Sequence, residues 1–340
     1  MPTVTVIIAN WNGQAFLPAC LEALSTQTYT DFEVLVVDNG STDGSVDCLQ
    51  ANWPGIRLIR LESNQGFAAA NNHGARLASG EWVAFLNNDA YPEPGWLAAL
   101  VSAALENPAA AAFASRILLV EPPDLLDSSG DIYHFSGNAW HRGYHQPAQQ
   151  FTPPAGEVFS ACAAAALYRK ADFLAWGGFD EDYFAYMEDI DLGFRLRLMG
   201  LPTYYAPEAI VRHVGSATAG IESRFTVYHV HRNLVWCYVT NMPGGTVWLY
   251  LPIHLLTALI FLVYYIKHGL GKPYLQAKWD AARGLGNAIS KRKHVQGQRK
   301  ANPGTIIARM DHGLFSPFLL GRSSKRLHHW LAERDPKGEA

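Results

Sequence analysis

The apolar residues in the first ninety positions gather in short runs without polar alternation. Residues 4–9, Phe32–Asp38 and 82–87 are three such runs, rich in β-branched and aromatic side chains. Continuous apolar runs predict strands buried on both faces, as in a parallel sheet. Residues 56–62 form a fourth candidate strand, and the segments 16–26 and 68–77 have helical character. Strands that alternate with helices predict a doubly wound α/β fold.

Polar clusters follow several of these predicted strands. One begins at Asp38 and runs to Asp43, a second contains Asn64 and Gly66, and a third is the string 87–89. Ligands of open α/β sheets collect at the carboxyl ends of the strands, so the clusters mark a candidate binding edge. Each string taken alone also fits an ordinary turn, because Asn, Asp, Ser and Gly are common in turns.

A second candidate site lies in the acidic string 188–191. Asp191 and Arg195 stand four residues apart on a predicted helix, a spacing that allows an ion pair. Glu188 could orient an acceptor or cap the helix, whereas Asp189 has no evident local partner and is the candidate general base. His213 follows a short predicted strand, 209–211, and is either a metal or phosphate ligand or a structural histidine.

The second half of the chain is less regular. Residues 121–157 are rich in Pro, Gly and His and predict an irregular surface excursion, whereas 180–199 predicts a turn followed by a helix. Residues 233–266 contain no Asp, Glu, Lys or Arg, and a Pro-Gly-Gly string splits this stretch. Residues 246–266 are long enough for a membrane span, but Pro252 and His254 interrupt them. A segment on the cytoplasmic membrane face is favoured, with a buried core helix as the alternative.

The distribution of charge distinguishes the first 266 residues from the segment that follows them. Residues 1–266 contain 12 basic and 25 acidic residues, a net charge of −13, whereas 267–300 contain nine basic residues and one acid, a net charge of +8. An acidic body with a basic segment does not suggest nucleic-acid binding, but it suits an anionic membrane surface. We predict a catalytic domain at 1–220, an apolar and then basic helical region at 221–300, and a tail at 301–340.

Several other classes of protein are disfavoured. The four cysteines show no paired spacing, so a disulfide framework and a zinc site are poor interpretations. Strand-like sequence follows the first residues without a signal peptide, which predicts a cytoplasmic body. No GxGxxG follows a strand and no GxxxxGK[ST] or GxSxG occurs, which argues against dehydrogenases, P-loop enzymes and α/β-hydrolases.

Six strings in order resemble the family 2 inverting glycosyltransferases of the GT-A fold, in particular the bacterial rhamnosyltransferase-like members. They span about residues 3–218 and read VIIANWNG, VVDNGSTDGS, NQGFAAANN, FLNNDA, GGFDEDYFAYMEDIDLGFRLR and VRHVGSAT. The resemblance implies a Rossmann-like nucleotide-diphospho-sugar transferase fold with a mostly parallel central sheet, followed here by a helical membrane-associated region.

The resemblance also implies roles for individual residues. Asp189 corresponds to the catalytic base, with Glu188 beside it, and Asp89 and His213 correspond to ligands of a divalent cation, Mn²⁺ or Mg²⁺. The implied donor-binding residues are Asn10, Asp38, Asn64, Gly66, Asn71 and Asn88. One position departs from the family pattern: Asn87 replaces the first acid of the Asp-x-Asp element and offers only a neutral carbonyl oxygen.

The expected reaction is a metal-assisted, single in-line displacement that inverts the sugar. By resemblance, the donor is dTDP-rhamnose or a UDP-sugar, and the acceptor is a lipid-linked or polysaccharide glycan of the cell envelope. The expected location is the cytoplasmic side of the cell membrane, with peripheral attachment. Two alternatives remain: a non-catalytic membrane-associated relative that acts as a scaffold, which the Asn87 departure favours, and a nucleotidyltransferase, which the lack of a basic N-terminal phosphate loop disfavours.

Overall fold

The structure is a computed structural model that describes residues 2–215 and 223–319. The predicted domain boundary after residue 220 and the residues 320–340 of the predicted tail lie outside the described residues. The described chain is built around a ten-stranded sheet whose main path runs β10-β12-β6-β11-β4-β1-β2-β3. Strands β5 and β7 pair with β12 and β6 at the sides of this path.

The N-terminal half of the sheet is parallel, as the continuous apolar runs predict. Strand β1 pairs in parallel with β2 and β4, and β2 pairs with β3. The bounds of these strands are β1 Val4–Asn10, β2 Phe32–Asp38, β3 Arg57–Arg60 and β4 Trp82–Leu86. Helices α1 Leu17–Ser25, α2 Ser45–Asn52 and α3 Phe67–Leu77 connect them. All four strands and the helices α1 and α3 confirm the predicted elements to within a few residues.

The second half of the sheet is mixed, so the expectation of a mostly parallel sheet is wrong there. Strand β11 lies antiparallel between β4 and β6, and β10 and β5 pair antiparallel with β12, whereas β12 and β6 are parallel. The bounds are β5 Ala90–Pro92, β6 Ala112–Leu119, β7 Leu126–Ser128, β10 Gly156–Val158, β11 Ala165–Arg169 and β12 Thr203–His213. Strand β12 is much longer than the predicted strand 209–211. Its register shifts between Ala206 and Ile210, around Pro207, which explains why only its end reads as a strand.

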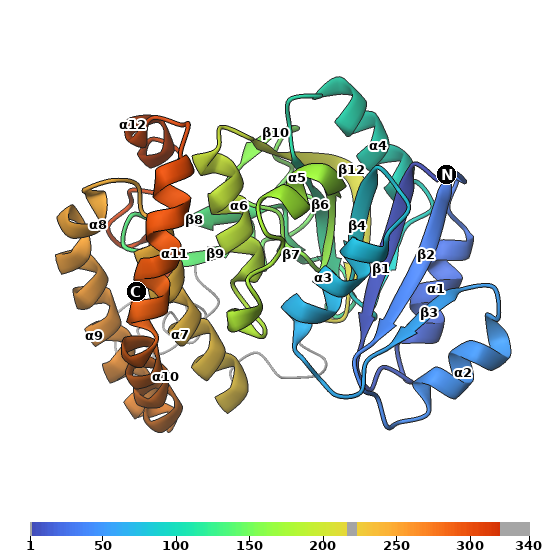
Figure 1. Cartoon of the computed structure of the whole chain (residues 1–340), viewed down its shortest axis with the longest axis horizontal. Helices are drawn as coiled ribbons and strands as arrows, with labels where there is room; N and C mark the ends of the chain where they lie inside the picture. The colour runs from blue at the N-terminus through green and yellow to red at the C-terminus, as the bar shows by residue number, and fades with distance from the viewer. Residues whose placement is uncertain (1, 216–222, 320–340) are drawn as a thin grey trace, which may run out of the picture.

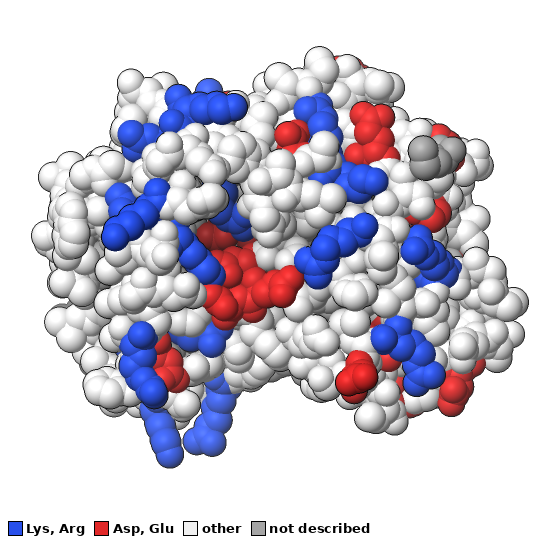
Figure 2. All heavy atoms as spheres, viewed as in Figure 1, with Lys and Arg blue, Asp and Glu red and all other residues white. Residues whose placement is uncertain are grey.

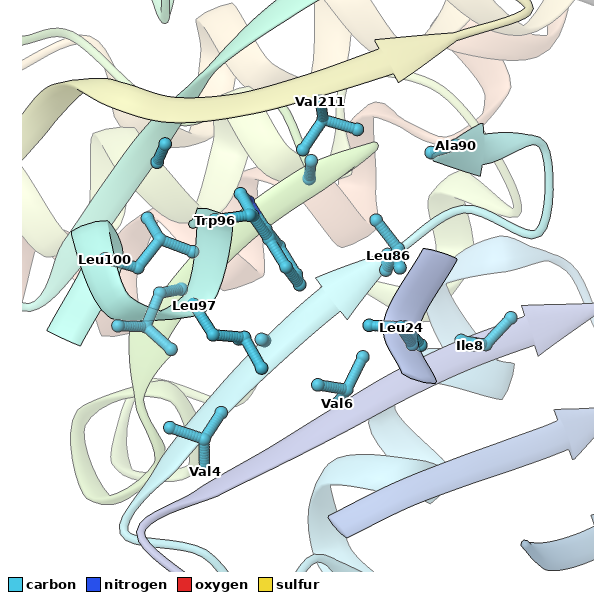
Figure 3. Close-up of a cluster of buried hydrophobic side chains, with 14 of the residues drawn as sticks. Val4, Val6, Ile8, Leu24, Leu86, Ala90, Trp96, Leu97, Leu100 and Val211 are labelled. Atoms are coloured by element: carbon cyan, nitrogen blue, oxygen red, sulfur yellow. The ribbon is translucent and has the colours of Figure 1, made fainter. Parts of the chain in front are cut away.

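Helices cover both faces of the sheet, which explains the lack of alternation in the strands. Val4, Val6 and Ile8 of β1 pack with α1 and α4 Trp96–Glu106 on one face, shown in Figure 3. Ile7 packs on the opposite face with α3, α5 Lys170–Ala175 and α6 Glu188–Leu198. The indole of Trp96 is fully buried in the first cluster, and its Nε1 donates to Ser115 Oγ at 2.8 Å.

The excursion predicted at 121–157 contains short strands as well as turns. Strand β7 joins the main sheet, and β8 Asp131–Tyr133 pairs antiparallel with β9 Ala139–His141 in a separate two-stranded sheet. This small sheet lies against the helices that follow, because the ring of Tyr133 packs in the same cluster as Phe194 of α6 and Tyr238 of α7 Arg224–Asn241.

The described residues after 223 form a group of helices beside the sheet, called here the helical unit (Figure 1). Its elements are α7 Arg224–Asn241, α8 Thr246–Leu249, α9 Leu251–Lys267, α10 Gly271–Arg283, α11 Leu285–Gln298, α12 Pro303–Ile307 and α13 Ser316–Leu319. Ser223 is the N-cap of α7, because its Oγ accepts from Thr226 N at 3.1 Å, and the helix packs against α6, α10 and α11. In the part of the chain that the structure describes, no helix combines the length and apolarity needed to cross a bilayer.

Candidate active site at the carboxyl edge of the sheet

Three of the predicted donor-binding residues meet where β1, β2 and β4 end. Asn10 and Asp38 are register partners in adjacent strands, and Asn10 Nδ2 donates to Asp38 Oδ1 at 3.2 Å. Asn88 Nδ2 donates to Asn10 Oδ1 at 2.9 Å. The second oxygen of Asp38 accepts from Ser41 N at 3.2 Å, and the Asp38 side chain is buried. Asp38 therefore bonds both to the end of β1 and to the loop that follows β2.

Asn64 and Gly66 belong to a neighbouring loop that is tied to the same strand end. Asn64 Oδ1 accepts from Asn39 Nδ2 and from Gly66 N, both at 2.9 Å. Gly66 has a φ of +91°, and a Cβ at this position would lie 2.5 Å from Phe184 O. Only glycine at position 66 permits this close approach of the two loops. Sequence reasoning missed Asn39, although it stands inside the Asp38–Asp43 string.

Asn71, also predicted to line the donor pocket, makes a hydrogen bond within its own helix. It is buried in α3, and its Nδ2 donates to Phe67 O at 3.0 Å. The next residue, Asn72, reaches across to the loop before α6. Its Nδ2 donates to Phe179 O at 2.7 Å and Glu181 Oε1 at 2.9 Å, and its Oδ1 accepts from Phe179 N at 2.8 Å. Asn72 therefore orients the acidic loop, a role that the sequence did not reveal.

The predicted metal ligands Asp89 and His213 lie together although 124 positions separate them in the sequence. His213 Nε2 is 3.2 Å from Asp89 Oδ1 and 3.3 Å from Asn87 Nδ2, while its Nδ1 is 2.7 Å from Asp127 Oδ2. Burial alone would lower the pKa of His213, but hydrogen bonds and charges from Asp127 and Asp89 outweigh burial and raise that pKa to about 10. Asp127 was not predicted, because nothing local marks this residue of β7 inside the irregular segment.

The residues around His213 fit a divalent cation that is completed by another molecule. Among residues 2–215 and 223–319, no three His, Cys, Asp or Glu side chains form a group that could hold a metal by themselves. Asn87 Oδ1, however, is buried without a hydrogen-bond partner in the described structure, beside the pair of Asp89 and His213. Neighbouring ligands of an octahedral Mg²⁺ lie about 3 Å apart, close to the Asp89–His213 separation. Phosphate oxygens commonly complete such sites.

The acidic string forms the first turn of α6, and its members have different surroundings. The predicted pair of Asp191 and Arg195 is confirmed, with Arg195 Nε donating to Asp191 Oδ2 at 2.8 Å. The expectation that Asp189 lacks a local partner is wrong. Its two oxygens accept from Ala163 N at 3.0 Å and from Ile190 N at 2.8 Å. The Asp189 carboxylate is therefore held in one orientation by backbone amides, and it stays partly exposed.

Glu188, in contrast, is an acid with one carboxyl oxygen unpaired among the described residues. Its side chain is buried, no side-chain hydrogen bond caps the helix, and Oε2 has no hydrogen-bond partner in the described structure. Burial, followed by the negative charge of Asp189, raises the pKa of Glu188 well above its usual value. Two adjacent carboxylates whose environments differ in this way suit different roles in proton transfer.

The acidic pair and the His213 group are connected through one loop. Ala163 N donates to Asp189, and the carbonyl of the next residue, Ala164, accepts from Asn87 N at 2.9 Å. The start of α6 and the end of β4 therefore flank the same short segment. Apart from Asn71 and Glu188, the predicted site residues make hydrogen bonds or ion pairs at this edge of the sheet.

Comparison with known proteins identifies relatives of this chain. The profile of the family described as Glycosyl transferase family 2 matches residues 5–174. The chain is 32% identical over 227 residues to the O-antigen biosynthesis protein RfbC of Myxococcus xanthus, a match covering 64% of this chain but only 18% of that protein. It is 31% identical over 250 residues to the N-acetylglucosaminyl-diphospho-decaprenol L-rhamnosyltransferase of Mycobacterium tuberculosis H37Rv, covering 63% of this chain and 77% of the relative.

Solved structures with low sequence identity share the fold. The S. aureus TarS 1-349 structure in complex with UDP-GlcNAc has a TM-score of 0.54 at 18% identity and covers 87% of this chain and 91% of TarS 1-349. The mannosyltransferase PcManGT from Pyrobaculum calidifontis, in complex with GDP-Man and Mn²⁺, has a TM-score of 0.51 at 18% identity, covering 86% of this chain and 85% of that chain. At this identity the likeness concerns the fold alone.

Proposed function

The chain belongs to glycosyl transferase family 2 and is a glycosyltransferase, and we propose that it transfers a sugar from a nucleotide-diphospho-sugar to a hydroxyl of a cell-envelope glycan with inversion. The observation that carries this proposal is the meeting of Asn87, Asp89 and His213 at the same sheet edge as Asp189. The relative named as an L-rhamnosyltransferase favours dTDP-rhamnose as the donor, with a UDP-sugar as the second candidate. Its name also favours a lipid-linked acceptor.

In this proposal the chain holds the donor on two loops. The loop after β2, organised by Asp38 and Asn10, and the loop around Gly66 present backbone and amide groups to the nucleotide. A divalent cation held by Asn87, Asp89 and His213 would neutralise the diphosphate leaving group. Asp127, on the other nitrogen of His213, fixes the orientation of the imidazole.

Asp189 is proposed as the general base. Two backbone amides orient its carboxylate, and its partial exposure leaves it accessible to an acceptor hydroxyl. Glu188, whose raised pKa favours the neutral acid, would donate a hydrogen bond rather than accept the proton. The acceptor oxygen then attacks the anomeric carbon while the nucleoside diphosphate leaves from the opposite face, a single displacement that inverts the configuration.

We also propose that the enzyme is attached peripherally to the cytoplasmic face of the membrane through its helical unit. Large apolar side chains of α8, α9 and α10 are exposed, among them Trp248 at 74%, Leu249 at 69%, Leu259 at 57% and Trp279 at 68%. Figure 2 shows an almost uncharged surface where α8 and α9 lie in Figure 1, with Lys and Arg side chains projecting beside α10. A combined apolar and basic face suits the surface of an anionic bilayer.

A hollow at the junction of α9 and α10 belongs to the same face. It has a volume of about 730 Å³ and is lined by Ile266, Leu275, Trp279 and Lys272, together with neighbouring backbone. Apolar walls with a lysine among the lining residues suit the interfacial part of a lipid, where acyl chain meets phosphate. The hollow therefore supports contact between this corner of the helical unit and lipid.

A thermal-shift titration of purified protein tests the proposed donor and metal. Mn²⁺ or Mg²⁺ together with the correct nucleotide sugar should raise the unfolding midpoint more than either alone, because the diphosphate completes the cation site. Asp89→Asn should lose the cooperation between cation and nucleotide and retain the wild-type midpoint without ligands to within a few degrees. Cation-independent donor binding would contradict the metal site, and donor binding without any sugar transfer would favour the scaffold alternative.

A further inference from the structure

The segment that leads into α6 has an unusual backbone. Phe184 has φ 65° and ψ −60°, and Ala185 N donates to Tyr183 O at 2.7 Å, which forms a γ-turn of the rare positive-φ type. Tyr186 and Met187 also have positive φ, at 68° and 73°. Bulky residues rarely adopt this conformation, and it persists only where the surroundings hold it.

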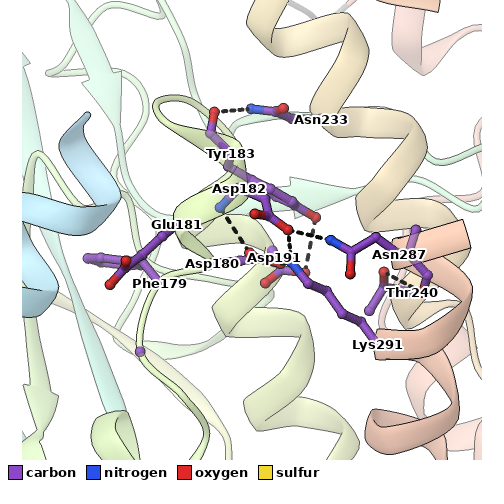
Figure 4. A network of polar contacts seen from close by, with 12 residues as sticks. Phe179, Asp180, Glu181, Asp182, Tyr183, Asp191, Asn233, Thr240, Asn287 and Lys291 are labelled. Atoms are coloured by element: carbon purple, nitrogen blue, oxygen red, sulfur yellow. Dashed lines mark hydrogen bonds and ion pairs between the residues drawn. The ribbon is translucent and has the colours of Figure 1, made fainter. Parts of the chain in front are cut away.

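A single buried amide of the helical unit holds this turn. Asn233 of α7 is fully buried, and its Nδ2 lies 3.0 Å from Tyr183 O, 3.0 Å from Ala185 O and 2.8 Å from Tyr186 O. The neighbouring Arg232 adds a bond from Nη2 to Tyr183 O at 2.9 Å. Figure 4 shows Asn233 pointing at Tyr183 from α7. Three carbonyl groups of the segment 183–186 thus lie against one side-chain amide.

The beginning of the same loop is held by α11. Lys291 Nζ lies 2.6 Å from Asp180 Oδ1 and 2.5 Å from Asp182 Oδ2, and Asn287 Nδ2 donates to Asp182 at 2.5 Å (Figure 4). On the face drawn in Figure 2, acidic side chains gather in the middle and basic side chains border them. The helical unit therefore fixes the loop at both ends of the segment 180–186.

Residues 183–186, the turn held by Asn233, lie beside both parts of the candidate site, the donor loop and the acidic pair. Phe184 O accepts from Ala68 N at 3.3 Å and lies where a Cβ of Gly66 would be, against the proposed donor loop. One residue after Met187, the chain reaches Glu188 and Asp189. A displacement of the turn would move the acidic pair relative to the donor.

We propose that Asn233 is a positioning residue for sugar transfer, and that the helical unit sets the geometry of the acidic pair in addition to any contact with the membrane. The inference rests on the proposed function of Asp189 and Glu188. Asn233 acts through the backbone of residues 183–186 and touches neither substrate. Its amide supplies donors to carbonyl groups of a turn that the backbone disfavours, so removal of the donors releases the turn.

The test compares Asn233→Asp with the wild type. The substitution keeps the size of the side chain but places a carboxylate, which cannot donate, against three carbonyl oxygens. Because small misplacements of reacting groups cost about 100-fold in rate, kcat should fall by roughly that factor. Donor affinity should fall by a much smaller factor, because Phe184 is joined to the donor loop by one hydrogen bond only in the described structure. Hydrogen–deuterium exchange of the amides of residues 184–190 should become faster at the same time.

Thr240→Val is the matched control, because Thr240 is a buried polar residue of the same helix that bonds to Ala288 O of α11 instead of the loop. It should change neither kcat nor the exchange of residues 184–190. If Asn233→Asp does not fold, Arg232→Ala should show the same changes to a smaller degree. It removes the bonds to Asp182 O and Tyr183 O and the 2.9 Å bond from Nε to Asn233 Oδ1, but keeps the Asn233 amide itself.

Wild-type exchange of residues 184–190 in Asn233→Asp, or an equal loss in Thr240→Val, would overturn the inference. The exchange measurement also separates it from the proposed function. If the wild type transferred no sugar from any donor, the proposed reaction would fail, whereas the exchange comparison would still decide whether Asn233 holds the turn.

Discussion

Asp189 and Glu188 are neighbours in the chain but differ in what surrounds their carboxyl groups. Asp189 accepts two backbone hydrogen bonds and is partly exposed, whereas Glu188 is buried with one oxygen unpaired. Backbone donors stabilise a carboxylate, and burial favours the neutral acid. Burial and the neighbouring charge of Asp189 raise the pKa of Glu188, so the two acids suit the different roles proposed for them.

Substitution of each acid in turn should separate their roles. Asp189→Asn preserves the shape of the side chain but removes the base, so kcat should fall by roughly 100- to 10,000-fold with donor binding unchanged. Glu188→Gln, which retains a neutral donor in the same place, should cost far less. Steady-state kinetics measure kcat of each variant, and calorimetric titrations measure its donor affinity. Near-normal transfer by Asp189→Asn and none by Glu188→Gln would assign the base to Glu188.

Local spacing could predict some of these residues and not others. Asp191 and Arg195 are four residues apart on one helix, so their pair is visible in the sequence. Asp127 reaches His213 across 86 positions, and the sheet that joins them cannot be inferred from either neighbourhood. The sequence shows no side-chain partner for Asp189, but its carboxylate accepts from the backbone amides of Ala163 and Ile190, contacts that no side-chain pattern predicts.

At the scale of elements, apolar patterning predicts what the strands bury but not how they are ordered. The parallel strands β1, β2 and β4 are continuous apolar runs because helices cover both of their faces. Strand β11 lies antiparallel between β4 and β6, and these pairs join residues far apart in the sequence. The run of alanines before β11 does not indicate the direction in which the strand runs. The segment 246–266 is divided between two helices, α8 and α9. Tyr250 is the C-cap of the first and the N-cap of the second, and Pro252 lies in the first turn of α9.

The contact between α9 and the small sheet should be sensitive to acid. His254 Nδ1 lies 2.8 Å from Ser136 O, and burial, together with the charge of Lys278, lowers the pKa of His254 to about 4. In the unfolded chain a histidine titrates near about 6.5, so the unfolded state takes up the proton first as the pH falls. Above pH about 6.5, His254 is neutral in both states and does not lower the free energy of unfolding. As the pH falls towards about 4, the depressed pKa of His254 lowers the free energy of unfolding by roughly 3 kcal/mol in total.

Chemical denaturation at several pH values measures this dependence. Between pH 6.5 and 4, the free energy of unfolding of His254→Gln should fall less steeply than that of the wild type, because glutamine does not titrate. His294→Gln, at an exposed position of α11, should leave the wild-type slope unchanged. Identical slopes in wild type and His254→Gln would show that His254 is not held neutral in the folded state.

At the scale of the whole molecule, the helical unit has two different sides. One side fixes the loop before α6 through Asn233 and Lys291, and the other exposes Trp248, Trp279 and the outer leucines of α9. The sequence predicted an apolar region followed by a basic one at this place, but it could not show that the same helices support the candidate site. The loop and α7 are some fifty positions apart, and only the packed structure brings them together.

Vesicle flotation tests the exposed side of the helical unit. Wild-type protein should float with vesicles of phosphatidylglycerol and phosphatidylcholine and bind phosphatidylcholine alone much more weakly. Replacement of Trp248 and Trp279 by Ser should weaken binding by at least about tenfold, since each buried aromatic side chain is worth roughly 2 kcal/mol. Leu105→Ser, at a 77% exposed position of α4, is the control and should bind as the wild type does. Equal flotation of all three proteins would contradict a membrane-facing role for α8 and α10.

The most direct measurement for the whole account is mass spectrometry of a lipid-linked glycan acceptor after incubation with purified enzyme, Mg²⁺ or Mn²⁺, and dTDP-rhamnose or a UDP-sugar. We expect the acceptor to gain the mass of one sugar with one of these donors. A chelator should suppress the gain, and Asp189→Asn should suppress it while still binding the donor. Donor binding at the Asp38 and Gly66 loops with no gain in acceptor mass, for any donor and cation, would contradict catalysis and identify the chain as a binding relative of the family.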